Sequence, residues 1–162
     1  MKGARGEIYG NQSQARSRWI SHRHAVLDRA GAAKALDFYK QAFGAVELFR
    51  MPQPDGRIGH AEIQIGDSRI MLADEHPEMG IRGPASLEGS SVMILLYVDN
   101  VDAAASRAVG AGAKVLRPVK DQFYGDRSGT FEDPFGHIWT IATHVEDLTP
   151  EEIERRAAAA HS

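Results

Sequence analysis

An alternating polar pattern in the first half of the chain has the composition of a metal or acid–base site. His60, Glu62 and Gln64 are separated by single apolar residues, so they share one face if this stretch is a β-strand. Imidazole and carboxylate groups bind divalent metals and also transfer protons. Same-face neighbours in a strand lie roughly 6.5–7 Å apart, so a metal held by His60 and Glu62 needs a further ligand, for which His24 and His144 are the candidates. The alternative is an ordinary solvated strand face or a dimer contact.

His144 lies near the end of a predicted strand and shares strand parity with Thr140. On that face it would serve as an acid, a base or a metal ligand, and the alternative is a hydrogen-bonding residue at a strand end. We therefore predict catalytic roles for His60, Glu62 and His144, and metal ligation by His24, His60 and Glu62.

Arg127 follows Gly125 and Asp126 in a glycine-containing segment. A guanidinium group binds a ligand carboxylate through paired hydrogen bonds, whereas the alternative is an ion pair that orders the loop. Apolar and aromatic side chains from several predicted strands and loops would form a wall against which a planar or alkyl ligand could pack. The predicted ligand-binding residues are Gln64, Met71, Met93, Tyr97, Tyr124 and Arg127.

Hydrophobic periodicity predicts the elements that hold these residues. A helix over residues 32–43 ends at Gly44, which suits the left-handed conformation of a helix C-terminus. Strands are predicted over residues 46–51, 58–65 and 69–73, and again over 114–117, 128–132 and 138–143. The apolar run 92–98 is typical of a strand buried on both faces, and residues 101–109 favour a short alanine-rich helix. Residues 76–91, rich in proline and glycine, form a linker.

The second group of elements repeats the first. Ala45 matches Ala113 and Ile70 matches Ile138, and the offset along the chain is the same for both pairs. The sequence thus predicts an α+β fold of two β-α-β-β-β modules, over residues 24–75 and 92–148. Residues 149–152 have the sequence TPEE, which is a capping box with proline at the first helical position. This motif predicts a C-terminal helix over residues 149–162.

The segment 1–30 differs from the rest of the chain. It holds six basic residues against two acidic ones, without a regular hydrophobic period, which indicates disorder or, as an alternative, an Arg- and Ser-rich transit peptide. The repeat requires an opening strand over residues 25–30, but Asp28 and Arg29 interrupt it. We hypothesise that the residues before Gly31 are translated out of frame. Synonymous codons for Tyr9 onward, read one base later, permit an N-terminal segment that ends in MPYLIV, which would supply the missing strand. The nucleotide sequence decides this hypothesis.

Composition excludes several classes of protein. The chain has 19 basic and 22 acidic residues and a net charge of −3, which argues against binding to a nucleic-acid backbone. It has no cysteine, as suits a protein of the reducing cytoplasm. No apolar run approaches the roughly 20 residues that span a bilayer, so we expect no membrane partner.

The motifs, taken in order, resemble those of the vicinal-oxygen-chelate superfamily, the glyoxalase and bleomycin-resistance group, and within it the PhnB-like branch. The resemblance covers residues 32–160. It is carried by ALDFYK at 35–40, FGA at 43–45, DGR at 55–57, HAE at 60–62, GDS at 66–68, MLAD at 71–74, DQFYGDR at 121–127, DPFGHIW at 133–139 and ATHVEDL at 142–148.

This resemblance implies that the two modules form an open, cup-shaped mixed sheet, usually completed in a homodimer, with a small-molecule ligand inside. In enzymes of the superfamily a divalent metal in the cup is held by one residue from each of four strands. Those positions fall here on His24, Met71, Met93 and Thr140. Three of the four are not normal ligands for such an ion, so we expect the usual metal site to be absent.

Two hypotheses about function follow. In the first, the protein is a metal-dependent lyase, isomerase or dioxygenase, as the polar pattern of His60, Glu62 and Gln64 favours. In the second, it is a non-catalytic protein that binds or sequesters an antibiotic or another planar or cationic compound, as Met71, Met93 and Thr140 favour.

Overall fold

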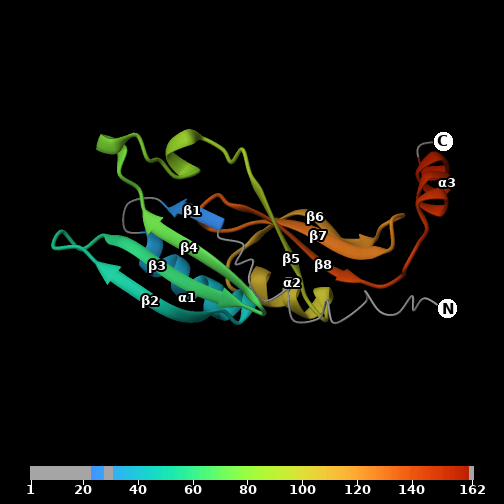
Figure 1. The fold of residues 1–162 in the computed structure, drawn as a ribbon, viewed down its shortest axis with the longest axis horizontal. Helices are drawn as coiled ribbons and strands as arrows, with labels where there is room; N and C mark the ends of the chain where they lie inside the picture. Colours follow the sequence, from blue (N-terminus) through green and yellow to red (C-terminus); the bar gives the residue numbers. More distant parts are fainter. Residues whose placement is uncertain (1–22, 28–30, 161–162) are drawn as a thin grey trace, which may run out of the picture.

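The computed structural model describes residues 31–160 and, for residues 23–27, the course of the backbone. The hypotheses for residues 1–22 and 28–30, disorder or translation out of frame, lie outside the described residues. The elements run in the order β1 (Arg23–Leu27), α1 (Gly31–Phe43), β2 (Val46–Pro52), β3 (Ile58–Ile65), β4 (Ser68–Asp74), η2 (Pro77–Met79), η3 (Ala85–Leu87), β5 (Met93–Tyr97), α2 (Val101–Gly110), β6 (Lys114–Asp121), β7 (Asp126–Glu132), β8 (Ile138–His144) and α3 (Pro150–Ala160) (Figure 1).

The strands form two four-stranded sheets with the same connectivity. Sheet 1 has the order β1-β4-β3-β2 and sheet 2 the order β5-β8-β7-β6. In each sheet the first strand pairs in parallel with the fourth, and the other neighbours are antiparallel. Each element of the first group thus has its counterpart in the second, with α1 and α2 in the same place in the order. The predicted α+β fold of two repeated modules is confirmed.

The opening strand of module 1 exists, although the sequence argued against it. Residues 23–27 pair in parallel with β4, and Arg23 stands opposite Ile70. The strand begins earlier in the chain than the repeat required, so it ends before Asp28 and Arg29. The expectation that these charges leave module 1 without its first strand is therefore wrong.

Buried polar contacts fix the start of α1. The Oδ1 atom of Asp74, at the end of β4, accepts a hydrogen bond from the Ala32 backbone N–H at 2.9 Å, and its Oδ2 accepts from the Ile58 N–H at 2.6 Å. Asp74 is 1% exposed and so satisfies a donor that a helix N-terminus leaves free. The helix ends at Gly44, whose φ of +66° is the left-handed conformation expected there.

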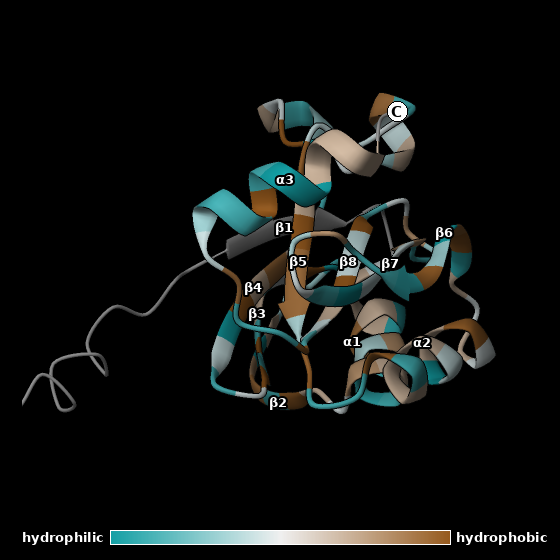
Figure 2. Ribbon diagram, turned by 90° about the vertical axis from the view of Figure 1, so that its right-hand side faces the viewer, coloured by the Kyte–Doolittle hydropathy of each residue, from teal (hydrophilic) through white to brown (hydrophobic). Residues whose placement is uncertain are grey.

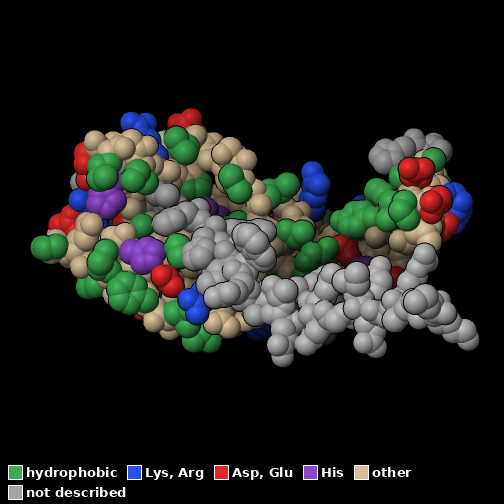
Figure 3. Space-filling model, in the orientation of Figure 1, with side chains coloured by type: hydrophobic (Ala, Val, Ile, Leu, Met, Phe, Trp, Pro, Cys, Tyr) green, Lys and Arg blue, Asp and Glu red, His purple; other side chains and the backbone are tan. Residues whose placement is uncertain are grey.

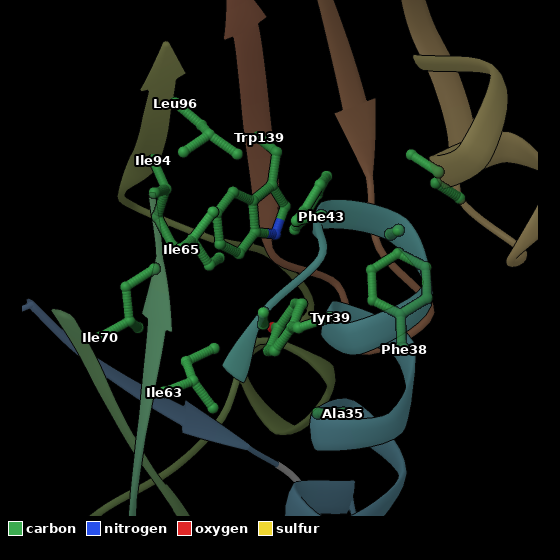
Figure 4. Packing of buried hydrophobic residues seen from close by; sticks show 14 of the residues in the cluster. Ala35, Phe38, Tyr39, Phe43, Ile63, Ile65, Ile70, Ile94, Leu96 and Trp139 are labelled. Carbon is green, nitrogen blue, oxygen red and sulfur yellow. The ribbon is translucent and has the colours of Figure 1, made fainter. Parts of the chain in front are cut away.

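The two modules share one core. Helices α1 and α2 lie side by side beneath the sheets (Figure 2). Trp139 of β8 is fully buried and packs on two rings of α1, with centroid separations of 5.3 Å to Tyr39 and 4.7 Å to Phe43 (Figure 4). The Tyr39 hydroxyl also donates to Asp133 Oδ2, across the module boundary, at 2.8 Å.

β5 is buried on one face only, which corrects the prediction that both faces are buried. Ile94 and Leu96 lie in the core, but Met93, Leu95 and Tyr97 are 64%, 47% and 55% exposed. The apolar run is thus continuous because two different surfaces need apolar side chains. One is the core, and the other is an exposed sheet face.

The linker and the C-terminal helix extend from the two sheets. Residues 76–91 contain η2 and η3 and pass beside the β7–β8 turn, where a side chain on Gly136 would lie 3.0 Å from Pro84. α3 begins as the capping box predicts, because the Thr149 hydroxyl accepts a hydrogen bond from the Glu152 N–H at 3.3 Å. Among the described residues, no helix is long and apolar enough to span a bilayer.

Candidate ligand-binding site

Each sheet has one face packed on helices and one face that no helix of the described chain covers. On sheet 1 the uncovered face carries His60, Glu62 and Gln64, which alternate with buried residues of β3. On sheet 2 it carries Leu95, Thr130 and Thr140 and the residues in register with them. We call these surfaces the first and the second open face.

The polar side chains of the first open face interact with one another. His60 Nε2 lies 3.2 Å from Glu62 Oε1, and an Arg69 guanidinium nitrogen lies 3.9 Å from Glu62 Oε2. The Phe49 ring lies beside that of His60, with centroids 6.2 Å apart. The structure thus brings His60 and Glu62 together as predicted from their spacing, but a cation already faces the carboxylate.

The second open face carries a cavity of about 550 Å³. Ser128 and Thr130, which are 4% and 9% exposed, are among its lining residues. Phe123 and Tyr124 contribute to its wall. Figure 3 shows this side of the molecule hollowed between the linker and α3, with hydrophobic and basic side chains around the hollow.

A tight hairpin loop places the two aromatic rings at this cavity. The Gln122 N–H donates to the Asp126 carbonyl at 2.7 Å, and Gly125 closes the turn with φ of +95°. A side chain at Gly125 would overlap the Glu146 carbonyl, so glycine is required there. The rings of Phe123 and Tyr124 meet edge to face at 5.2 Å, a favoured aromatic geometry that fixes both in place.

A hydrogen-bonded network lies at the end of the second open face. The Tyr97 hydroxyl donates to Asp126 Oδ2 at 2.6 Å, and His144 Nδ1 lies 2.9 Å from Asp126 Oδ1. His144 Nε2 lies 2.9 Å from Asp147 Oδ1. The bond to Asp126 raises the pKa of Tyr97 to about 12, so the phenol remains a hydrogen-bond donor at neutral pH.

The sequence model of the Glyoxalase/Bleomycin resistance protein/Dioxygenase superfamily matches residues 23–141. The chain belongs to this superfamily. The match begins at the first residue of β1, in agreement with the strand that the structure places there.

Relatives of this superfamily member occur in bacteria and plants. Protein Mb0911c of Mycobacterium bovis is 46% identical over 134 residues, which cover 81% of this chain and 87% of that protein. Among solved structures, TioX from Micromonospora is 28% identical with a TM-score of 0.58, over 77% of this chain and 99% of that one. The Arabidopsis thaliana At5g48480 gene product is 28% identical with a TM-score of 0.60, over 75% and 95% of the two chains.

The residues at the superfamily's metal positions do not fit a divalent cation. On sheet 1, His24 of β1 pairs with Met71 of β4. On sheet 2, Thr140 of β8 pairs with Leu95 of β5, the strand that also carries Met93. Thioether sulfur suits soft ions such as Cu(I), not Mg²⁺, Mn²⁺ or Zn²⁺. The Thr140 hydroxyl lies 3.3 Å from that of Thr130. We therefore derive no chemical step through a metal.

The predicted ligand set of His24, His60, Glu62 and His144 is divided between the two sheets. Among the residues whose side chains are described, no group of three or more His, Cys, Asp or Glu is placed to hold a metal. His144 lies on sheet 2, while His60 and Glu62 lie on sheet 1. The backbone of His24 lies two strands from Glu62, with Met71 between them, a separation of about 10 Å.

The surroundings of His144 favour a cation over a general base. Because carboxylates only accept hydrogen bonds, both ring nitrogens must carry a proton to complete the bonds to Asp126 and Asp147. The bonds to Asp126 and then Asp147 raise the pKa of His144. A general base needs a free nitrogen, so in this geometry His144 acts as an ion-pairing group that joins β7 to the segment before α3.

Arg127 points away from the second open face. Its guanidinium forms two bonds of 2.8 Å to Asp102 of α2 and one of 3.0 Å to Asp121. These carboxylates bind the guanidinium group for which the sequence suggested a ligand carboxylate. Arg127 therefore forms an ion pair, which was the alternative interpretation, but its partners are Asp102 and Asp121 and not Asp126. Arg127 therefore has no part in the site that we propose.

Two lining residues of the cavity, Arg117 and Lys120, were not among the predicted site residues. The predicted strand, 114–117, ends just before Pro118, and a proline within a strand removes a backbone donor. β6 in fact continues to Asp121, and it can do so because an edge strand tolerates proline. One feature of the sequence does indicate that the strand continues: Val119, just after the proline, is β-branched and apolar, as is typical of strands.

The remaining predicted ligand residues lie on both open faces. Gln64 and Met71 lie on the first, and Met93 and Tyr97 on the second. A further cavity of about 360 Å³ lies where the β3–β4 hairpin approaches β5, and Tyr97 and Arg69 line it. Tyr97 thus stands between the modules, whereas Tyr124 lies at the larger cavity.

Proposed function

We propose that this protein binds a planar small molecule in the cavity of the second open face and that binding requires no metal. The observation that carries the proposal is the cavity itself. Its lining includes two aromatic residues and the largely buried Ser128 and Thr130. Thr140 also lines it, at a position where the family resemblance implies a metal ligand in the superfamily's enzymes.

The composition of the cavity matches what a planar ligand needs. Its volume of about 550 Å³ lies within the range of small-molecule pockets, about 300–1,000 Å³. The Tyr124 ring, 40% exposed, offers a surface on which a flat ring can pack, and an aromatic pair contributes about 0.5–1.5 kcal/mol beyond its buried area. Ser128 and Thr130 supply hydroxyls that orient a polar substituent.

A calorimetric screen of planar compounds, run with and without EDTA, tests this proposal. We expect saturable binding that EDTA does not change and that Tyr124→Ala weakens about tenfold, since the change removes one stacking surface. Leu87→Ala is the control, because Leu87 is an exposed apolar residue of η3 that does not line the cavity. Absence of any planar ligand, or binding that EDTA abolishes, would contradict the proposal.

We further propose that the protein is a homodimer in which the open faces are covered. Exposed apolar side chains occur on both sheets: Phe49 and Met51 are 50% and 49% exposed on β2, and Met93 and Leu95 are 64% and 47% exposed on β5. Apolar surface of this kind is typical of interaction sites. Leu95→Lys should yield a monomer by sedimentation velocity, and a wild-type monomer at micromolar concentration would contradict the dimer.

A second candidate function is a metal-dependent enzyme, which the His60–Glu62 pair at 3.2 Å favours. In a dimer, a partner subunit would have to supply the remaining ligands. Elemental analysis of protein purified without a metal column distinguishes the two functions, because the enzyme requires one divalent ion per site. Protein without metal that still binds its ligand excludes this candidate.

Two finer assignments complete the proposal. We place the chain in the PhnB-like branch on the motifs at residues 121–127 and 133–139. We place it in the cytoplasm on the absence of cysteine.

A further inference from the structure

An irregularity in β6 brings two cationic residues to the same face of sheet 2. Arg117 pairs with Thr130 and Lys120 pairs with Ser128, so a step of three residues on β6 matches a step of two on β7. In a regular strand, residues three apart point to opposite faces. The extra residue of a β-bulge removes that difference, so Arg117 and Lys120 both stand opposite residues of the second open face.

The packing of Val119 holds this irregularity in place. Val119 is partly buried and packs against the core. It lies over Gly129, where a side chain would come within 2.9 Å of its Cγ2 atom. Glycine at 129 therefore leaves room for Val119 to turn inward, which leaves the two cations on the outer side.

Within the part of the chain that the structure describes, neither cation at the cavity has a carboxylate partner. Arg117 and Lys120 line the cavity, and no ion pair joins either of them to another side chain among residues 31–160. The nearby acids have other partners: Asp121 binds Arg127, and Asp126 binds Tyr97 and His144. Lys114, on the same strand, does have a partner, since its ammonium lies 3.7 Å from Glu132.

We infer that the ligand of this cavity is an anion, a planar aromatic compound that bears a carboxylate or sulfonate group. The inference rests on the proposed function and narrows it, because the second hypothesis from the sequence included cationic compounds. Arg117 and Lys120 bind the acidic group at the rim, and the guanidinium can form paired bonds to it. The Ser128 and Thr130 hydroxyls bind further oxygens, and the ring packs on Tyr124.

Three compounds that share a naphthalene ring and differ in charge test this inference. Naphthalene-2-carboxylate, naphthalene-2-carboxamide and 2-naphthylmethylammonium carry charges of −1, 0 and +1, and naphthalene-2-sulfonate serves as a second anion. We expect the carboxylate to bind about tenfold more tightly than the amide, because two partly exposed charge pairs contribute about threefold each. We expect the ammonium compound to bind most weakly.

Matched variants locate the preference on β6. Arg117→Gln and Lys120→Gln should each weaken binding of the carboxylate about threefold and leave binding of the amide unchanged. Lys114→Gln removes the same charge from the same strand outside the cavity and should change neither affinity. All three side chains are exposed, so the variants should fold, which circular dichroism checks.

The outcomes separate the inference from the proposed function. Equal affinity for the three compounds, tighter binding of the ammonium compound, or equal loss in all three variants overturns the inference while small-molecule binding stands. If none of the compounds binds and the wider screen also finds no ligand, both fail. Preference for the carboxylate over the sulfonate, or the reverse, identifies the acidic group.

Discussion

The hydrogen bond from Tyr39 to Asp133 crosses the module boundary inside the core, so Tyr39→Phe tests how firmly the two modules are joined. The hydroxyl donates to Asp133 Oδ2 at 2.8 Å, and both residues are buried. Burial, and then the charge of Asp133, raises the pKa of Tyr39 well above its ordinary value, so the phenol remains protonated throughout the stability range of the protein.

The stability lost in Tyr39→Phe depends on the hydrogen bonds that Asp133 keeps in the variant. A hydrogen bond to a charged group contributes about 1.5–3 kcal/mol. In the variant, Oδ2 still accepts from Trp139 Nε1 at 3.0 Å, and Oδ1 still accepts from the Phe135 and His137 N–H groups, each at 2.9 Å. The carboxylate is therefore not left unsatisfied, and we expect a loss of about 1.5–2 kcal/mol.

Urea unfolding at pH 7 measures this loss. With an m value of about 1.5–2 kcal/mol/M, the midpoint should fall by roughly 1 M. Tyr124→Phe is the control, because the Tyr124 hydroxyl makes only a 3.5 Å contact with Ser128, and it should cost less than about 0.5 kcal/mol. If the two variants lose the same stability, the bond to Asp133 does not join the modules as described.

Two further predictions concern the segment that leads to α3. Gly125→Ala should destabilise the protein by at least about 2 kcal/mol in the same assay, because φ is +95° and the new side chain would overlap the Glu146 carbonyl. The control is Gly66→Ala, which should cost only about 1 kcal/mol, because Gly66 has a φ of +59° but open space around it. Equal losses in the two variants would disprove the role of the contact with Glu146. The carboxylates around His144 raise its pKa, so its contribution to stability is complete below about pH 6.5 and declines as the pH rises through the raised value. The thermal midpoint of wild type should therefore fall above about pH 6.5 more steeply than that of His144→Gln, and parallel curves would contradict this.

The fold was predictable where local patterns agree with the tertiary structure. The alternation from Ile58 to Ile65 defines β3 to the residue, and Gly44 marks the end of α1. Burial on both faces was wrong for β5, because an apolar run cannot tell a core from an exposed apolar surface. Charges near β1 were equally misleading, since they lie just after the strand.

The candidate site was less predictable, because it depends on side-chain direction. Spacing alone paired His60 with Glu62. Neither the bulge that aligns Lys120 with Arg117 nor the partners of Arg127 in α2 and β6 can be derived from sequence spacing. The site therefore emerges from strand register, which local patterns do not specify.

The most direct test of metal-independent binding at the second open face is a titration of ¹⁵N-labelled protein with naphthalene-2-carboxylate in buffer containing EDTA. We predict that the largest shifts of backbone amide signals occur at Ser128, Thr130 and Thr140, and that they do not change when Zn²⁺ replaces EDTA in the buffer. Shifts that avoid these three amides, or that occur only when a divalent metal is present, would contradict the account.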